Sequence, residues 1–265
     1  MTTEAAKAFF DKWGYLRVPG AFEESNSLRM QEWLWVRMRE VHGIEKSDPA
    51  TWNVPWPGTH VTEKQSGLSP ARMATTAFQS TADAVLGANA WRLPKEWSGA
   101  LISFPKPDDA PWTVIADGWH WDTDVAAHLD GPQSLFTFAV FSHIEPQGGG
   151  TLLLAGSHHL LNRFFTAMTP AEQAAKMKKH REQFHRSSPY LAALTGKAPF
   201  DGDRIARFMA EADDNDVAVQ VVEVTGQPGD AFLCHPSLLH AVSANRRRVP
   251  RLMRITQARK VSGEG

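Results

Sequence analysis

A histidine and an aspartate lie two positions apart near the middle of the chain, at His120 and Asp122. The surrounding residues 112–121 are rich in β-forming and aromatic types, so we expect a strand there. Successive side chains of a strand alternate between its faces, which puts these two on the same face. They are then placed as metal ligands, but such a short pair also arises often by chance. The hypothesis of a metal site therefore needs a third ligand.

Two histidines near the C-terminus compete for that third position, His235 and His240. Five positions separate them, so in an unbroken strand they would face opposite sides, although Pro236 is expected to interrupt the strand. We expect only one of them to face the pocket. The sequence favours His240, because a loop over 243–250 follows it and leads into a β-prone run that begins with Arg251. Such a hairpin can return a guanidinium group to the metal's neighbourhood, where it could hold a carboxylate through two hydrogen bonds.

Two histidines and one carboxylate on a β-scaffold form the facial triad of non-haem Fe(II) oxygenases, which leaves positions on the metal for a co-substrate and O₂. An arginine offset from that triad is what the co-substrate 2-oxoglutarate requires, because its distal carboxylate needs a cationic partner. The combination of His120, Asp122, His240 and Arg251 is therefore a far more specific signal than any of its parts.

With these residues in place, the chain resembles the phytanoyl-CoA dioxygenase family of Fe(II)- and 2-oxoglutarate-dependent oxygenases over nearly its whole length. Residues 9–20, with the pattern FF…GYLRVPG, are similar to the opening of that family. The segment 148–158, GGGTLLLAGSH, resembles its glycine-rich strand ending in Gly-Ser-His, although Ala155 stands where the family usually has proline. Residues 228–251 are similar to the last family motif, with a histidine and an arginine eleven positions apart.

The resemblance implies both a fold and a set of roles. The fold is a double-stranded β-helix, or jelly roll, with the iron inside its mouth. His120, Asp122 and His240 hold Fe(II), while Arg251 binds 2-oxoglutarate and O₂ is the further co-substrate. Beside the co-substrate the resemblance places one aromatic and two hydroxyl side chains, Phe138, Thr151 and Ser243.

The same resemblance implies a reaction in which 2-oxoglutarate is converted to succinate and CO₂ while an unactivated C–H bond of a small organic molecule is oxidised. Hydroxylation is the default outcome, and desaturation or ring formation would use the same ligands. The substrate is not required to be a CoA thioester.

The pattern of the chain predicts the same fold class without the resemblance. Short β-prone runs are separated by Gly, Pro and Asp from Trp97 onward, and they cover 99–104, 112–121, 134–143, 150–155, 218–224, 230–235, 238–243 and 251–258. Eight short strands indicate a sandwich or a barrel. We therefore expect one domain over residues 1–265, mainly β with helical decoration, whose β core covers 97–158 and 216–260.

The N-terminal part, residues 1–96, is expected to be mainly helical. Hydrophobic residues recur at near-helical spacing over 3–13, 25–41 and about 69–86, and a strand is expected at 15–19. Pro and Gly residues mark an extended connector between the second and third of these helices.

A helical insertion, residues 159–215, is expected to interrupt the β core. Thr169 and Pro170 begin a helix that we expect to continue to about Arg186, with a further short helix over about 203–212. Long connections near active sites often exclude water from the reaction. We therefore expect the insertion and the connector 44–68 to form a mobile lid over the mouth of the jelly roll.

The histidines outside the triad are expected to have structural roles. His158 and His159 follow Ser157 and are interpreted as turn and cap residues. His143 lies in an apolar run, which indicates a hydrogen-bonded core histidine. His180 and His185 are five apart in a basic helix, whereas a helical zinc pair needs four, so we expect surface positions for both.

Two other clusters each allow a structural and a functional interpretation. All 10 tryptophans lie at or before position 121, where they could anchor helices on a core or form an aromatic wall around a ligand. Arg246–Arg248 could be a solvated hairpin tip or could bind an anionic group of the substrate.

Composition excludes several classes of protein. The 265 residues contain 28 Lys and Arg against 29 Asp and Glu, so nucleic acid is not expected as a partner. The apolar run 135–141 is far shorter than a membrane span, and no signal peptide is visible, so we expect a cytoplasmic protein without a membrane partner. A single cysteine, Cys234, excludes a disulfide framework and is expected to be buried. A small-molecule substrate is expected, and nothing in the sequence indicates a homo-oligomer.

Two other functions remain open at this stage. One is a cupin-like isomerase or hydrolase with zinc or manganese, which would not need Arg251. The other is a non-catalytic β-sandwich binding module whose histidines are structural.

Overall fold

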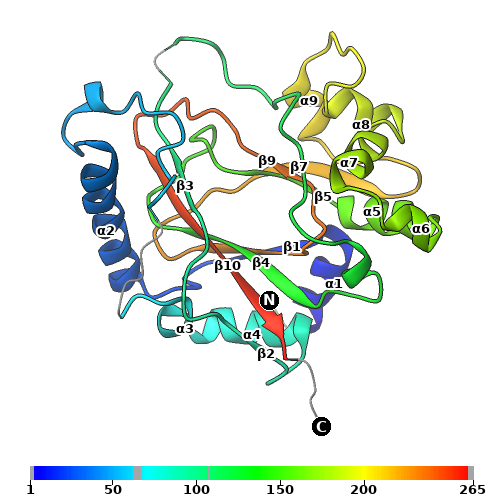
Figure 1. Cartoon of the computed structure of the whole chain (residues 1–265), viewed down its shortest axis with the longest axis horizontal. Helices are drawn as coiled ribbons and strands as arrows, with labels where there is room; N and C mark the ends of the chain where they lie inside the picture. The colour runs from blue at the N-terminus through cyan, green and yellow to red at the C-terminus, as the bar shows by residue number, and fades with distance from the viewer. Residues whose placement is uncertain (1–2, 62–66, 107, 262–265) are drawn as a thin grey trace.

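The computed structural model describes residues 3–61, 67–106 and 108–261, which form two facing antiparallel sheets flanked by helices (Figure 1). The larger sheet has the strand order β1-β8-β4-β10-β2, with β3 also paired to β10, and the smaller has the order β6-β7-β5-β9. The strands are β1 (Tyr15–Val18), β2 (Trp91–Arg92), β3 (Ala100–Ser103), β4 (Ser134–Val140), β5 (Leu152–Ala155), β6 (Ala212–Asp213), β7 (Ala218–Glu223), β8 (Ala231–Cys234), β9 (His240–Ala241) and β10 (Arg251–Lys260).

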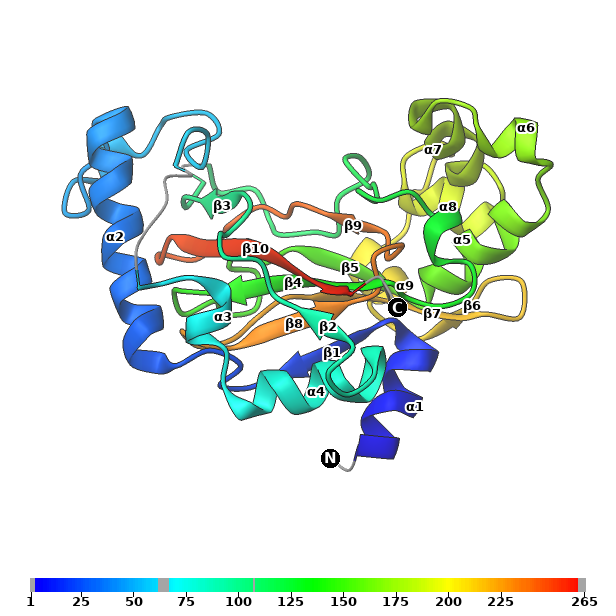
Figure 2. The ribbon, with the colours of Figure 1, turned by 60° about the horizontal axis from the view of Figure 1, so that its bottom comes forward.

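Helices flank the sheets in two groups, one from the N-terminal part of the chain and one inserted between β5 and β6 (Figure 2). The N-terminal group is α1 (Thr3–Trp13), α2 (Glu24–His42), α3 (Pro70–Met73) and α4 (Thr76–Leu86). The insertion provides α5 (Ser157–Thr166), α6 (Pro170–Gln173), α7 (Met177–His185), α8 (Pro189–Leu194) and α9 (Arg204–Phe208). Short 3₁₀ turns cover Pro49–Thr51 and Ala126–His128.

Alternation along the strands divides the apolar residues among three layers of core. In β5, Leu153 packs in the space between the sheets with Phe138 and Val140 of β4. Its neighbours Leu152 and Leu154 face the other way, toward the insertion helices. The space between the sheets is therefore lined from both sides, as in a sandwich.

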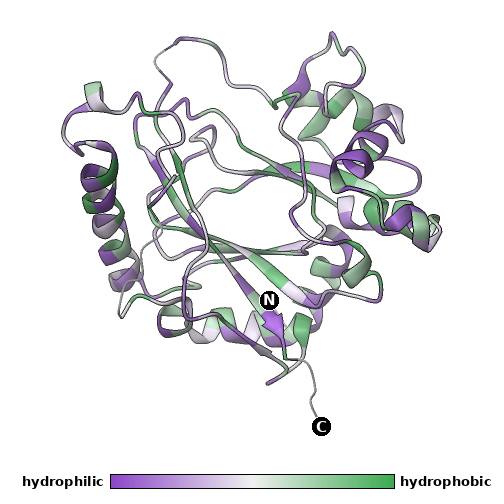
Figure 3. Ribbon diagram, viewed as in Figure 1, coloured by the Kyte–Doolittle hydropathy of each residue, from purple (hydrophilic) through white to green (hydrophobic). Residues whose placement is uncertain are grey.

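The N-terminal helices cover the outer face of the larger sheet. Their buried residues include Phe10 of α1, Met30 and Leu34 of α2 and Phe78 of α4, which belong to one cluster with Leu233 of β8. Figure 3 shows hydrophobic and hydrophilic residues mixed along α2, as expected of a helix with one buried face. The expected helix over 3–13 and the strand beginning at Tyr15 are both present.

The insertion covers the outer face of the smaller sheet. Its helices bury Leu161, Phe165 and Phe184 against the outward residues of β5 and β7, together with Trp121. Trp121 makes edge-on contacts with both phenylalanine rings, at centroid distances of 6.4 and 5.6 Å. Trp121 thus has the core-packing role, which was one of the two interpretations of the tryptophans.

Two sequence-based expectations about elements are wrong. Residues 112–121 form no strand, and only His120 has a bridge partner there, because the turn around Gly118, with φ of 76°, interrupts extended pairing. The helix expected from Pro170 to Arg186 is divided into α6 and α7. The capping box at Thr169 is present, but the backbone at Lys176 is extended, with ψ of 137°.

Three expectations about histidine burial are also wrong. His143 is exposed, whereas His180 and His185 are buried. His180 donates to the carbonyl of Glu172 and meets the Phe165 ring edge-on, because α7 packs on α5 and does not lie on the surface.

Within the described residues, no helix combines the length and the apolar character that a membrane span requires.

Gly156 offers a direct test of this packing. It is the N-cap residue of α5, with φ of 83°, and a Cβ there would lie 2.0 Å from the carbonyl oxygen of Ala218. Gly20 has a similar φ of 59° with nothing within 4 Å of such a Cβ. We expect Gly156→Ala to lower the free energy of unfolding by roughly 3 kcal/mol and Gly20→Ala by about 1 kcal/mol, measured by denaturant titration. Equal losses in the two variants would contradict the close approach of α5 to β7.

Candidate metal centre

His120 and His240 are brought together by the backbone. The amide of His120 donates to the carbonyl of His240 at 2.9 Å, and the amide of His240 donates back at 2.8 Å. This reciprocal pair puts the two imidazole rings 4.4 Å apart between centroids. His240 is itself fixed by the pairing of β9 with β5, opposite Leu153.

Asp122 completes a group of three potential ligands. Its Oδ1 lies 3.6 Å from Nε2 of His120, and its Oδ2 lies 3.3 Å from Nε2 of His240. One donor atom from each of the three residues falls within 4.8 Å of the others, so a single cation can contact all three. His120 and Asp122 thus point to the same side, as expected. The isolated bridge between His120 and His240 produces this arrangement, and no strand forms there.

The backbone also fixes which ring nitrogen faces the carboxylate. Nδ1 of His120 donates to the carbonyl of Gly118 at 2.7 Å, and Nδ1 of His240 donates to that of Leu238 at 3.0 Å. In neutral rings the Nε2 lone pairs therefore point toward Asp122, as metal-binding histidines require. Two lone pairs facing a carboxylate are favourable only with a proton or a metal cation between them.

Electrostatics favour the metal-binding protonation states. Burial and the neighbouring His240 lower the pKa of His120 below its usual value. A hydrogen bond with His240 is the largest cause of a lowered pKa at Asp122. At neutral pH an ionised carboxylate and a neutral imidazole are thus available to bind a cation.

The pocket beside these ligands is mainly apolar. Phe136 stacks on the His240 ring at 5.9 Å, and Phe138 meets it edge-on at 5.6 Å. Phe138 therefore lies beside the triad. The residues lining this pocket are Asp122, Phe136, Phe138, Leu153, Cys234, His235, Pro236, Leu238 and His240.

Arg251 is a buried cation. Its side chain is 3 % exposed, and neither Nε nor Nη1 has a hydrogen-bond partner in the described chain. Burial lowers its pKa to about 10, while the carboxylate of Glu223 acts in the opposite direction, so the guanidinium stays charged at neutral pH. An uncompensated buried charge is costly. A bound carboxylate would supply the missing acceptors.

The hairpin that returns Arg251 depends on Asn245, which is fully buried. Its Nδ2 donates to the carbonyls of Ser103 and Val249, and its Oδ1 accepts from the amide of Arg247. The adjacent Arg246 pairs with Asp108. Arg248 at the tip is exposed.

The two expected hydroxyl residues are both buried. Ser243 Oγ is buried and has no hydrogen-bond partner among residues 3–61, 67–106 and 108–261. Thr151 is 3 % exposed, and its carbonyl accepts from the amide of Val224. Next to Thr151, Glu223 accepts from the amides of Gln147 and Gly150, which fixes the glycine-rich turn. Sequence reasoning did not single out this carboxylate.

Two residues of the insertion that sequence reasoning placed on the surface or left unassigned lie near the triad. Arg181 of α7 donates to the carbonyl of Trp121, between the two ligands, and its charge acts on both His120 and Asp122. His185 is buried, with its pKa lowered to about 4, mainly by burial. Their proximity depends on how α7 folds back, which local sequence does not encode.

Comparison with known proteins places this geometry in context. The sequence model of the phytanoyl-CoA dioxygenase family matches residues 10–253. Among curated protein sequences, no significant match was found.

Several solved structures share the fold. AviO1 from Streptomyces viridochromogenes Tue57 has 15 % identity and a TM-score of 0.54, over 100 % of this chain and 97 % of that one. The non-haem α-ketoglutarate-dependent carbocyclase SnoK from nogalamycin biosynthesis has 15 % identity and a TM-score of 0.51, over 98 % of this chain and 86 % of that one. EctD from S. alaskensis, solved with 2-oxoglutarate and 5-hydroxyectoine, has 14 % identity and a TM-score of 0.51. The match covers 98 % of this chain and 77 % of that one. These likenesses show the expected jelly-roll fold.

We expect Ala substitutions at His120, Asp122 and His240 each to weaken Fe(II) or Co(II) binding by more than about 100-fold, since losing a residue behind the ligands alone costs roughly 10–100-fold. Equilibrium dialysis under anaerobic conditions measures the affinity, and circular dichroism should show an unchanged fold. The exposed His143→Ala variant serves as the matched control. Metal retained by His240→Ala but lost by His235→Ala would contradict this ligand set.

Proposed function

The chain belongs to the phytanoyl-CoA dioxygenase family of non-haem iron and 2-oxoglutarate-dependent oxygenases, and we propose that it hydroxylates an unactivated C–H bond of a small organic molecule. In this proposal His120, Asp122 and His240 hold Fe(II), and Arg251 holds the distal carboxylate of 2-oxoglutarate. When bound, iron and 2-oxoglutarate supply the oxidising chemistry, in which O₂ is consumed, succinate and CO₂ are released and one oxygen atom enters the substrate.

The observation that carries this proposal is the pairing of a metal-binding triad with a buried arginine that lacks acceptors. A hydrolytic metal centre needs the triad but gives no reason to bury a guanidinium whose Nε and Nη1 have no partner in the described residues. A dianionic co-substrate gives such a reason, because its far carboxylate can accept from both atoms. The carboxylate of Glu223 then remains committed to the amides of Gln147 and Gly150.

The chain's own residues have three tasks in the reaction. The carbonyls of Gly118 and Leu238 hold the two imidazoles in the metal-binding tautomer. Phe136 and Phe138 limit rotation of the His240 ring and help to exclude water from the pocket. The apolar lining suits a substrate whose reacting carbon carries no charged group.

Hydroxylation is proposed ahead of ring closure or epimerisation because it makes the smallest demand on the protein. It needs only one C–H bond presented to the metal, whereas the other outcomes require a second reacting group at a defined position. The segments 159–215 and 44–68 remain candidates for a lid. Residues 62–66 of the second segment lie outside the described part of the chain.

The direct test of the activity is release of succinate. The purified protein, supplied with Fe(II), 2-oxoglutarate and O₂, should form succinate slowly without substrate and faster with a compound that it oxidises. Zinc or manganese in place of iron should not support succinate release. Activity toward an ester or an isomerisable sugar with zinc, without consumption of 2-oxoglutarate, would favour the hydrolase or isomerase alternative.

Arg251 should control co-substrate affinity specifically. We expect Arg251→Ala to raise the dissociation constant of 2-oxoglutarate by about 10- to 100-fold, since a hydrogen bond to a charged group contributes roughly 1.5–3 kcal/mol. Arg251→Lys should have a smaller effect, because lysine keeps the charge but loses the planar pair of donors. The measurement is an anaerobic titration of the Fe(II)-loaded protein with 2-oxoglutarate.

The matched control for this series is Arg248→Ala, at the exposed tip of the same hairpin. It should bind 2-oxoglutarate like the unmodified protein. If Arg251→Ala retained normal affinity and a normal fold, the assignment of the co-substrate site would be wrong.

A further inference from the structure

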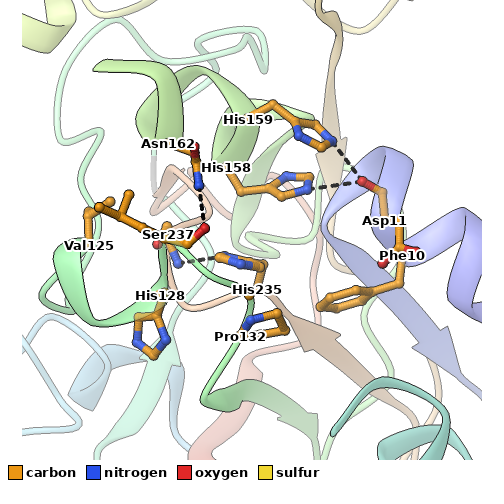
Figure 4. A pocket seen from close by; sticks show the side chains of 12 residues that line it. Phe10, Asp11, Val125, His128, Pro132, His158, His159, Asn162, His235 and Ser237 are labelled. Carbon is orange, nitrogen blue, oxygen red and sulfur yellow. Dashed lines mark hydrogen bonds between the residues drawn. The ribbon is translucent and has the colours of Figure 1, made fainter. Parts of the chain in front are cut away.

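A second cavity lies beside the metal pocket and has no role in the function proposed above. Its volume is about 260 Å³, and it lies between α1, α5, the 3₁₀ turn Ala126–His128 and the segment that follows β8 (Figure 4). Four histidines line it: His128, His158, His159 and His235. His235 also lines the metal pocket, so the two spaces share one wall.

The four imidazoles follow one another as a row (Figure 4). Ring centroids are separated by 6.2 Å from His128 to His235, by 4.9 Å from His235 to His158 and by 4.0 Å from His158 to His159. They come from three distant segments of the sequence. A row of this kind is unusual as simple packing, because each ring brings polar atoms that need partners.

Hydrogen bonds to the backbone use one nitrogen of each ring. Nδ1 of His128 accepts from the amide of Gln133, and Nδ1 of His235 accepts from the amide of Ser237. Each of these two neutral rings must therefore carry its proton on Nε2, which makes Nε2 a donor. His158 and His159 donate through Nε2 to the carbonyl of Asp11.

Two polar atoms of residues that line the cavity are buried and have no partner within the described part of the chain. They are Oγ of Ser237, whose side chain is almost fully buried, and Nδ1 of His158, which is 8 % exposed. Buried polar atoms without partners are rare, and each is a reason to look for a ligand. The hydroxyl of Ser237 and the Nε2 atoms of His128 and His235 are three groups that can donate, whereas Nδ1 of a neutral His158 accepts.

The charges around the cavity favour an anion. Asp11, the acid among the lining residues, is paired through its carboxylate with Lys7 at 2.6 Å. The charge of Asp124 acts to raise the pKa of His128, but its carboxylate already accepts a hydrogen bond from the amide of Ala126. The first turn of α5, which carries His158, has no acidic residue, and the N-terminus of a helix attracts negative charge.

Burial, the first cause in each case, lowers the pKa of His128, His158 and His235, so these three rings favour the neutral form. A bound anion opposes that shift, because it stabilises the imidazolium form. Protonation would also turn Nδ1 of His158 from an acceptor into a donor. Anion binding should therefore be accompanied by uptake of protons.

A second metal centre fits these observations less well. The backbone amides of Gln133 and Ser237 already occupy the Nδ1 lone pairs of His128 and His235, and their Nε2 atoms carry protons. Metal binding would require these rings to lose those hydrogen bonds or to change tautomer. No group of three potential ligand atoms within the described residues meets at this cavity.

We propose that this cavity is a binding site for a small oxyanion, a carboxylate or phosphate group, held by Nε2 of His128 and His235 and by the hydroxyl of Ser237. The anion could be free in solution or could be one end of a larger molecule. Because His235 borders both spaces, a ligand here touches the wall of the metal pocket.

The test uses the Zn(II)-loaded protein, in which the metal centre is filled and diamagnetic. Long-range ¹H–¹⁵N spectra of the histidine rings report the tautomer of each one while inorganic phosphate or octanoate is added. We expect saturable shifts at His128, His158 and His235, and none at the exposed His143. His128→Gln and Ser237→Ala should each raise the dissociation constant of the anion by about tenfold, and His143→Gln should leave it unchanged.

Parallel assays of the Fe(II)-loaded protein distinguish the two sources of the anion. Octanoate that shifts these rings and also accelerates succinate release indicates the carboxylate of a substrate-like molecule. Phosphate that binds without changing succinate release indicates a free anion. Both results support the site.

Three results would overturn the proposal. One is the absence of saturable shifts with either anion, and another is equal affinity in the unmodified protein, His128→Gln and Ser237→Ala. The third is a second equivalent of Zn(II) that binds tightly and is lost in His128→Gln, which would show a metal centre in its place. None of these results depends on whether the iron-dependent reaction is hydroxylation.

Discussion

The reciprocal hydrogen bonds between His120 and His240 are the constraint on which the candidate site depends. They join a loop in the first half of the chain to the short strand β9, and β9 is held in turn by β5. With both Nδ1 atoms committed to backbone carbonyls, the two imidazoles present their lone pairs to Asp122. The resulting convergence of two lone pairs and a carboxylate is favourable only with a proton or a metal cation among them. A metal ion can satisfy all three groups at once.

A second uncompensated charge, Arg251, lies in the adjacent part of the sandwich. Its burial is maintained by long-range structure: β10 pairs with β4 and β3, and Asn245 fixes the hairpin that precedes it. Among the described residues, Arg251 is a positive group whose Nε and Nη1 lack acceptors, and Asp122 is a negative group facing two lone pairs. In our proposal an anionic co-substrate that also chelates a metal would resolve both at once, so the two features support one function and not two.

Sequence reasoning predicted most of this arrangement, but not always for the right reason. Periodicity located α1 at Thr3–Trp13 and the strand that begins with Arg251, because local pattern decides both. The His120–Asp122 spacing predicted a shared face through a strand that does not form; a single bridge next to Gly118 has the same effect. The failures at His143, His180 and His185 share a cause, since burial there depends on how α7 and the loop after β4 pack. The row of histidines at the second cavity was not predicted as a group, because its members come from separate segments that only the tertiary fold brings together.

The most direct test of this account is a crystal structure of the protein prepared anaerobically with Fe(II) and 2-oxoglutarate, with anomalous diffraction recorded at the iron edge. The account predicts one anomalous peak within bonding distance of Nε2 of His120, a carboxylate oxygen of Asp122 and Nε2 of His240. It also predicts that the distal carboxylate of 2-oxoglutarate accepts hydrogen bonds from Arg251. Iron bound at other residues, or 2-oxoglutarate held away from Arg251, would contradict it.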